Sequence, residues 1–303
     1  MRIRIIASRH SAFYSPLLAA AASLRDEGHD IPYGVLAPGQ RTHVLLRDGE
    51  VDIMQSAVSS NWPLIEKQIE PLPVHFAQIN CRDGFFLAGR RPEPAFWWED
   101  LEGRALLADH GLQPLTMLKY ALKHNGVDWA AIHVVDGGAP QQSAAAFRDG
   151  AADYVHQQGP IVAGGEFVAS VGASMPPVAF SSLCCARSYL ETDAFRLFLA
   201  AFERAKDWVR TAPAGEIARR LAEFFPVVST EVLADAVSRY QRLGCWDGGV
   251  GIPRDLYEQA LNVFESAGGI ARRHPYEEVV STEPHSDRSA DIGSIRDARS
   301  AGK

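Results

Sequence analysis

Polar side chains gather in this sequence just after the segments whose composition is typical of β-strands. His10 and Ser11 follow the first such segment, residues 2–8, and the aromatic side chains of Phe13 and Tyr14 come next. Imidazole, hydroxyl and aromatic groups together can hydrogen-bond to and stack on a small polar molecule. Because ligands of open α/β sheets bind outside the carboxyl ends of the strands, these positions are candidates for a binding site. By the same criterion the further candidates are Gln40, Arg41, Ser56, Ser59, Ser60, Asn61, His110, Gln113, Gly138, His156 and Gln157.

The chemistry of these candidates favours an anionic or heteroaromatic ligand. Arg41 lies in a predicted loop beside Gln40, and a guanidinium group binds carboxylate, sulfonate or phosphate through two parallel hydrogen bonds. Gln113 and Gly138 lie at predicted helix N-termini, where unpaired N–H groups and the helix dipole stabilise negative charge. We expect a small molecule to be held by these groups without a metal or a cofactor.

Fewer side chains could support catalysis. The four cysteines show no spacing typical of a metal site, and no Gly-x-Ser-x-Gly motif occurs. His10 and Ser11 could in principle form a hydrolytic dyad, but adjacent residues rarely bring hydroxyl and imidazole into line. A decarboxylase or another proton-transfer enzyme, with His10, His110 or His156 as its acid or base, stays open as an alternative.

A repeated motif predicts two related lobes that position the candidates. Arg47-Asp48-Gly49-Glu50-Val51-Asp52 returns 101 residues later as Arg148-Asp149-Gly150-Ala151-Ala152-Asp153. In each copy an apolar helix ends at a glycine suited to a left-handed C-terminal cap, and a strand with a polar end follows. This spacing is too long for a solenoid repeat and suits two α/β lobes. We therefore predict that the two segments occupy equivalent places and that polar strand ends face a common gap.

Strand and helix signals alternate along the chain, as a parallel sheet requires. In the first part, strands are predicted at residues 2–8, 31–36, 52–57, 74–80 and 84–88, with helices at 16–28, 41–48 and 61–70. The second part repeats this order with strands at 105–108 and 131–135 and helices at 112–124 and 141–148, before a returning strand at 178–184. Amphipathic helices are predicted from residue 193 and at 214–222, 230–243 and 253–266.

The composition is that of a globular chain with no nucleic-acid partner and no membrane insertion. Its 303 residues carry a net charge of −7, 47% are hydrophobic, and no run of Lys or Arg marks a polyanion-binding surface. No apolar segment is long enough to span a membrane, and none has the pattern of a signal peptide. As written, the chain is expected to be cytoplasmic, or periplasmic if a signal peptide has been removed.

Several motifs resemble those of the periplasmic-type (type II) solute-binding proteins, in the branch that holds the nitrate-, sulfonate- and taurine-binding and the thiamine-pyrimidine-precursor proteins. They are Phe13-Tyr14-Ser15-Pro16-Leu17, Gly49-Glu50-Val51-Asp52-Ile53, Asp100-Leu101-Glu102-Gly103-Arg104, Phe147-Arg148-Asp149-Gly150-Ala151-Ala152-Asp153 and Trp246-Asp247-Gly248. The resemblance covers residues 1–268. It implies an α/β fold of two lobes, each a mainly parallel sheet flanked by helices, with the ligand cleft between them. By this likeness residues 1–88 and 182–268 form the first lobe, 89–181 form the second, and 269–303 are an extension that is disordered from about 283.

The resemblance implies a receptor whose lobes hinge shut on a small molecule, with the membrane component of an ABC transporter as a partner. Two enzymatic relatives supply an alternative. The thiamine-pyrimidine-synthase branch carries a cysteine cluster where this sequence has only Cys184-Cys185, which the family layout puts near the cleft. The desulfinase branch has a nucleophilic cysteine in the loop that here reads Arg9-His10-Ser11. We expect a binding protein; a cytoplasmic enzyme on the same scaffold is the alternative, and a ligand sensor for a protein partner is the third reading.

Overall fold

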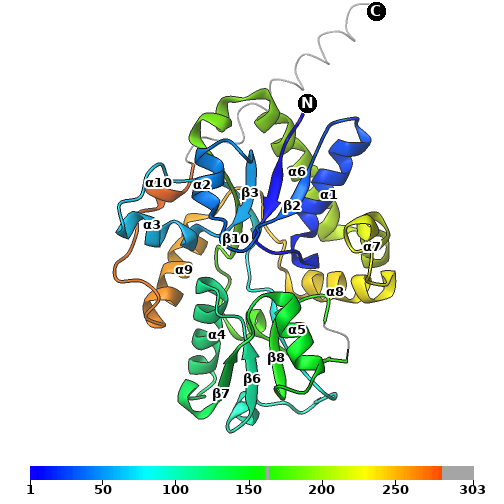
Figure 1. Cartoon of the computed structure of the whole chain (residues 1–303), viewed down its shortest axis with the longest axis vertical. Coiled ribbons are helices and arrows are strands. Elements are labelled where there is room, and N and C mark those ends of the chain that lie inside the picture. Colours follow the sequence, from blue (N-terminus) through cyan, green and yellow to red (C-terminus); the bar gives the residue numbers. More distant parts are fainter. Residues whose placement is uncertain (162–163, 282–303) are drawn as a thin grey trace, which may run out of the picture.

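Two five-stranded sheets flanked by helices make up the computed structural model, which describes residues 1–161 and 164–281 (Figure 1). We call the sheet that contains the N-terminal strand, with its helices, the first lobe, and the other sheet with its helices the second lobe. The chain enters the second lobe once and returns once, so the first lobe is discontinuous in sequence. The two-lobed α/β architecture predicted from the sequence is confirmed.

The first sheet has the strand order β2-β1-β3-β10-β4. Strands β1 (Ile5–Ala7), β2 (Tyr33–Val35) and β3 (Ile53–Ser56) are parallel, whereas β10 (Ser181–Cys185) runs antiparallel to both β3 and β4 (Val74–Asn80). The beginning of β10 therefore lies beside the carboxyl ends of its neighbours, and Ser182 pairs with Ser56.

The second sheet repeats this topology in the order β7-β6-β8-β5-β9. Strand β6 (Ala105–Ala108) is parallel to β7 (His133–Asp136) and β8 (Tyr154–Gln158), and β5 (Phe85–Gly89) is antiparallel to both β8 and β9 (Glu166–Ser170). The strand expected to leave the first lobe, β5, thus lies inside the second sheet. Strand β9 was not predicted.

The two copies of the repeated motif occupy equivalent places. Gly49 and Gly150 follow helices α2 (Thr42–Arg47) and α5 (Pro140–Arg148), and both have positive φ, 66° and 92°. Five residues into each copy, an aspartate carboxylate accepts a hydrogen bond from the backbone N–H of the neighbouring strand: Asp52 from Arg4 at 2.7 Å and Asp153 from Ala105 at 3.0 Å. The bonded residues are again 101 positions apart, so the predicted duplication is confirmed.

The helices begin where the sequence offers caps. Helix α1 (Ser15–Asp26) has Pro16 in its first turn and packs against α6 (Asp193–Thr211), whose first turn is capped by the Thr192 hydroxyl. Helix α3 (Trp62–Glu66) belongs to the first lobe, and α4 (Leu112–His124) flanks the second. The later helices are α7 (Ala214–Leu221), α8 (Thr230–Leu243), α9 (Arg254–Ser266) and α10 (Tyr276–Val279).

The two segments that cross between the lobes are hydrogen-bonded to each other. Residues 81–84 lead from β4 to β5, and residues 171–180 lead from β9 back to β10. The N–H of Val178 donates to the Cys81 carbonyl at 2.9 Å, and that of Phe180 donates to the Asn80 carbonyl at 3.1 Å. Apolar contacts run through this region, because the ring of Phe13 from the first lobe packs edge-on against Phe180. The lobes therefore share a continuous apolar core.

The last described residues pack on the first lobe. Val280 bridges to His75 of β4, and His274 lies 3.2 Å from the Glu66 carboxylate. The tail predicted from residue 283 lies outside the described residues. Across residues 1–161 and 164–281, no helix combines the length and the apolar character needed to cross a membrane.

Candidate functional site

A cavity of about 160 Å³ lies where the two lobes meet. The loop after β1 contributes His10 from the first lobe, and the end of β8 contributes His156 and Gln157 from the second. Gly138, just before α5, also lines it. These four residues were predicted from strand and helix ends, and the structure brings them together around one cavity.

An ion pair between the lobes forms part of the cavity wall. The guanidinium of Arg9, two residues after β1, binds the carboxylate of Asp109, the residue directly after β6. Both terminal nitrogens of Arg9 are engaged, and Nη2 lies 2.9 Å from Oδ1. The guanidinium also lies 5.8 Å from the centre of the Phe85 ring. Only 23% of the Arg9 side chain and 11% of the Asp109 side chain are exposed, so water screens the pair poorly.

His156 is the most unusual polar group of the cavity. It is buried, its ring stacks on Phe85 at 4.5 Å, and neither ring nitrogen has a hydrogen-bond partner within residues 1–161 and 164–281. Burial lowers the pKa of His156 to about 3, so the ring is neutral and can donate one hydrogen bond and accept another. The residue that corresponds to His156 in the first lobe is Gln55, 101 positions earlier. The side chain of Gln55 is hydrogen-bonded to Ser8, so this corresponding group does have a partner. A buried polar group without a partner is costly, which makes His156 a candidate for contact with a ligand.

Two further buried amide atoms beside His156 also lack partners. They are Nε2 of Gln157 and Oε1 of Gln158. The other end of the Gln158 amide donates to the Tyr14 hydroxyl across the lobe boundary at 3.3 Å. The end of β8 therefore offers both a donor and an acceptor beside the neutral imidazole.

His10 and Ser11 do not form a dyad. The His10 ring contacts the Tyr33 hydroxyl at 3.0 Å and the Phe224 carbonyl at 2.7 Å, and burial lowers its pKa. The Ser11 hydroxyl donates instead to the Gly159 carbonyl at 2.7 Å. Each side chain thus connects other parts of the fold, and the hydrolytic arrangement has no geometric support.

Several predicted residues lie at the lobe contact without lining the cavity. The Ser59 hydroxyl of the first lobe donates to the Gln113 side chain of α4 at 2.5 Å, and Gln113 in turn donates to the Phe180 carbonyl at 2.6 Å. Tyr14 bonds to Gln158, and Phe13 is wholly buried in the core. These contacts hold the lobes together.

The remaining predicted residues do not line the cavity, and their contact with a ligand stays a prediction. Gln40 and Arg41 are exposed before α2, where Gln40 accepts from the Ala37 N–H at 2.8 Å. Ser56 and Ser60 bond to each other at 2.9 Å. Asn61 is buried in the first lobe, donating to Pro73, and His110 lies 3.3 Å from the Asp136 carboxylate.

The cysteine pair lies at the end of the first sheet that forms the far edge of the first lobe, not near the cleft as the family layout suggested. Because β10 is antiparallel, Cys184 and Cys185 pair with the first residues of β4, His75 and Val74. Both thiols are buried, and burial raises the pKa of Cys185 to about 12. Within residues 1–161 and 164–281, no group of three or more His, Cys, Asp or Glu side chains could hold a metal ion.

Replacing Cys184 and Cys185 together by alanine is expected to lower the free energy of unfolding by about 1 to 2 kcal/mol, because small voids form in a packed sheet. Affinity for a ligand in the interlobe cavity should not change. Urea unfolding and calorimetric titration of the same preparation check both halves. A lost affinity with unchanged stability would contradict the placement of this pair.

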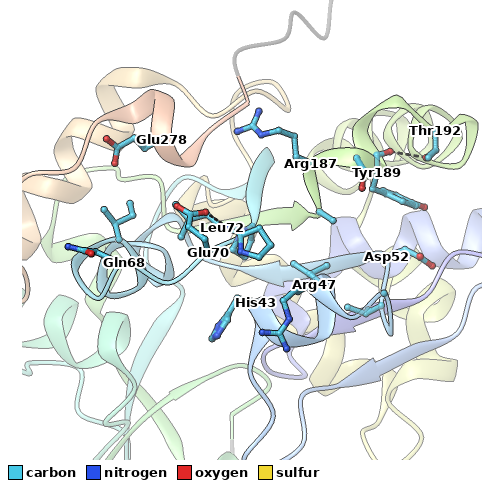
Figure 2. A pocket seen from close by; sticks show the side chains of 18 residues that line it. His43, Arg47, Asp52, Gln68, Glu70, Leu72, Arg187, Tyr189, Thr192 and Glu278 are labelled. Atoms are coloured by element: carbon cyan, nitrogen blue, oxygen red, sulfur yellow. Dashed lines mark hydrogen bonds between the residues drawn. The ribbon is translucent and has the colours of Figure 1, made fainter.

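A larger, open cavity of about 920 Å³ lies at that same far edge of the first lobe (Figure 2). Its wall mixes apolar side chains with charged ones such as Arg47, Asp52 and Arg187. Asp52 is paired with Arg4, and Arg47 with the adjacent Asp48. We place the candidate site in the smaller cavity, because only that one combines both lobes with buried polar atoms that lack partners.

Solved structures with the same architecture are numerous. The ligand-binding component of an ABC-type import system from Staphylococcus aureus, solved with zinc, is 12% identical over 93% of this chain and 97% of its own, with a TM-score of 0.72. The alkanesulfonate-binding protein from Xanthomonas axonopodis pv. citri, bound to MOPS, is 13% identical over 92% and 98%, with a TM-score of 0.68. The chain has the type II solute-binding-protein fold.

The same fold is found in a DszB variant in complex with biphenyl-2-sulfinic acid, which is 15% identical over 93% of this chain and 97% of its own, with a TM-score of 0.61. Comparisons with models of protein families and with curated proteins find no match. At these identities the likeness establishes the fold, and the binding-protein and DszB neighbours share it.

Proposed function

We propose that this protein binds a small anionic or heteroaromatic molecule between its two lobes, as the solute receptor of an ABC-type importer or as a relative of such receptors. Similar structures include import components and an alkanesulfonate-binding protein. In this proposal the partner is the importer's membrane component, and the compartment is the periplasm or, for a relative outside import, the cytoplasm.

The observation that carries the proposal is the set of unpaired buried atoms beside a cation. Neutral His156 and the Gln157 and Gln158 amides offer donors and acceptors, and Arg9 supplies a positive charge on the opposite wall. Helix α5 begins at the cavity with Pro140, so its dipole also favours negative charge there. A small anion with hydrogen-bonding atoms on its other side would match all three.

Its size restricts the ligand. At 160 Å³ the cavity holds the equivalent of about five water molecules, well below the volume of a drug-sized site. A larger ligand would require the lobes to separate, and the crossing segments 81–84 and 171–180 are where we propose that they hinge.

Replacing Arg9 by glutamine is expected to weaken a copurified anionic ligand by about 1.5 to 3 kcal/mol, because a charge-assisted hydrogen bond in a poorly hydrated cavity is lost. The ligand is identified by mass spectrometry of denatured protein, and calorimetry measures its affinity. Arg187→Gln, on the rim of the larger cavity, is the matched control and should bind as the wild type does. Weaker binding by that variant alone would move the site to the far edge of the first lobe. Arg41→Gln tests in the same titration the position predicted from sequence.

The likeness to DszB keeps an enzyme as the second candidate function. The loop after β1 carries no thiol, and Ser11 is bonded to a carbonyl rather than to a base. A receptor returns its ligand with unchanged mass after long incubation, whereas an enzyme alters it. A third reading, a sensor for a protein partner, would share the receptor's chemistry and differ only in what binds the closed lobes.

A further inference from the structure

We propose that Asp109 is an internal substitute for the ligand's anionic group, so that a ligand must displace Asp109 in order to bind Arg9. The inference rests on the proposed function, and it adds to the same site a residue that regulates access of the ligand to Arg9. It assigns Asp109 the role of a latch between the lobes rather than that of a ligand contact.

The geometry of the pair is that of guanidinium bound to a small anion. Both terminal nitrogens of Arg9 are engaged by the two oxygens of one carboxylate, which is the fork arrangement that a ligand carboxylate or sulfonate would adopt. The glycine at position 111 leaves room for the ion pair. A Cβ atom there would lie 2.7 Å from Nη2 of Arg9 and 3.0 Å from Oδ1 of Asp109. A side chain at position 111 would therefore collide with the pair.

Asp109 is held in place by its own lobe. Its Oδ1 accepts a hydrogen bond from the Gly111 N–H at 2.8 Å, at the start of helix α4. The carboxylate therefore retains a partner and a favourable helix end when Arg9 leaves it. The Arg9 side chain, in contrast, donates hydrogen bonds to Asp109 alone among the described residues.

The latch also joins the lobes at equivalent points. Arg9 follows β1 and Asp109 follows β6, the strands that occupy corresponding positions in the two sheets. Among the described residues, these two are the only Arg, Lys, Asp or Glu side chains on the cavity wall. A neutral ligand cannot replace the carboxylate on Arg9, whereas an anion can, so the latch would favour anions over their neutral analogues.

The test compares small anions with neutral molecules of the same shape. Calorimetry measures binding of acetate, methanesulfonate and inorganic phosphate, with acetamide and methanesulfonamide as neutral counterparts, to the wild type and to Asp109→Asn. The variant keeps an acceptor for the Gly111 N–H but releases Arg9, so an anion that binds should bind about tenfold more tightly, and the amides should not. Asp109→Ser provides a second variant of the same kind.

Asp136→Asn is the matched control. It removes one negative charge from the same lobe, but Asp136 faces His110 and the Gly138 N–H rather than Arg9. Equal tightening by Asp136→Asn and Asp109→Asn would reduce the effect to net charge and overturn the latch. Unchanged or weaker anion binding by Asp109→Asn, when Arg9→Gln weakens wild-type binding as expected, would overturn the latch and leave the proposed function standing. If no anion binds the wild type or either Asp109 variant, both the latch and the proposed anion site fail.

Discussion

Gly172→Ala is expected to lower the free energy of unfolding by about 3 kcal/mol, because the new methyl group would meet backbone that cannot move aside. A Cβ atom at this position would lie 2.1 Å from the carbonyl oxygen of Asp83 and 3.0 Å from its carbonyl carbon. Gly172 lies on one crossing segment and Asp83 on the other, so relief of the clash requires the two segments to separate. Urea unfolding followed by circular dichroism measures the loss.

Gly34→Ala is the control for this variant. Gly34 lies in the edge strand β2, and a Cβ atom there has no neighbour within 4 Å. Its replacement should leave stability within about 0.5 kcal/mol of the wild type or raise it slightly, since alanine reduces the entropy of the unfolded chain. Equal effects of the two substitutions would contradict the close approach of the crossing segments.

Elements with strong local signals were predicted well. Helix α4 and strands β4 and β6 have the predicted bounds, because an apolar pattern and turn residues such as Asn125-Gly126 define both ends of such segments. The duplicated motif also predicted correctly that the two lobes have equivalent elements, since its aspartate accepts a hydrogen bond from the backbone beside it in each lobe. Strand β9 lacks such signals: it pairs on one side only, and none of its residues is fully buried.

Only part of the site was predicted. The rule that ligands bind outside the carboxyl ends of strands indicates a region of the fold but not which side chains line it. His10 and His156 follow from it, but so do Arg9 and Asp109, which lie within two residues of the ends of β1 and β6 and were missed. Which of several adjacent residues face the other lobe depends on how the lobes contact each other, and this is not a local property. Arg41 lies six residues after the end of β2, and the described residues of the cavity come from β5, β8, α5 and the loops that follow β1, β6, β7 and β8.

Stability is expected to pass through a maximum near pH 6.5, because buried groups with opposite pKa shifts titrate on either side of it. Burial lowers the pKa of His75 and His156 to about 3, and each is protonated in the unfolded chain below about pH 6.5. Burial raises the pKa of Asp83 to about 8, aided by the nearby Asp109 charge and opposed by the Phe85 N–H. Between pH 4.5 and 6, therefore, unfolding takes up two protons at the histidines and releases one at Asp83, so stability rises by about 1.4 kcal/mol per pH unit. The lowered pKa of His10 adds to this slope.

Above pH 7 two buried groups differ between the folded and unfolded states. The folded Asp83 carboxyl still holds a proton that the unfolded one has lost, and burial lowers the pKa of Lys206 to about 8, so the folded ammonium loses a proton that the unfolded one keeps. The two differences have opposite effects on stability and become equal near pH 8, so stability should fall by only about 0.4 kcal/mol between pH 7 and pH 8. Asp83→Asn removes this group but keeps an acceptor for the Phe85 N–H, which lies 2.5 Å from Oδ1. In that variant stability should rise by about 2.7 kcal/mol per pH unit below pH 6 and by about 0.6 kcal/mol in total between pH 7 and pH 8. Urea midpoints at half-unit steps from pH 4.5 to 8 measure both slopes. The same profile in wild type and variant would mean that Asp83 is ionised in the folded protein, and that the crossing segment holds a buried charge rather than a neutral acid.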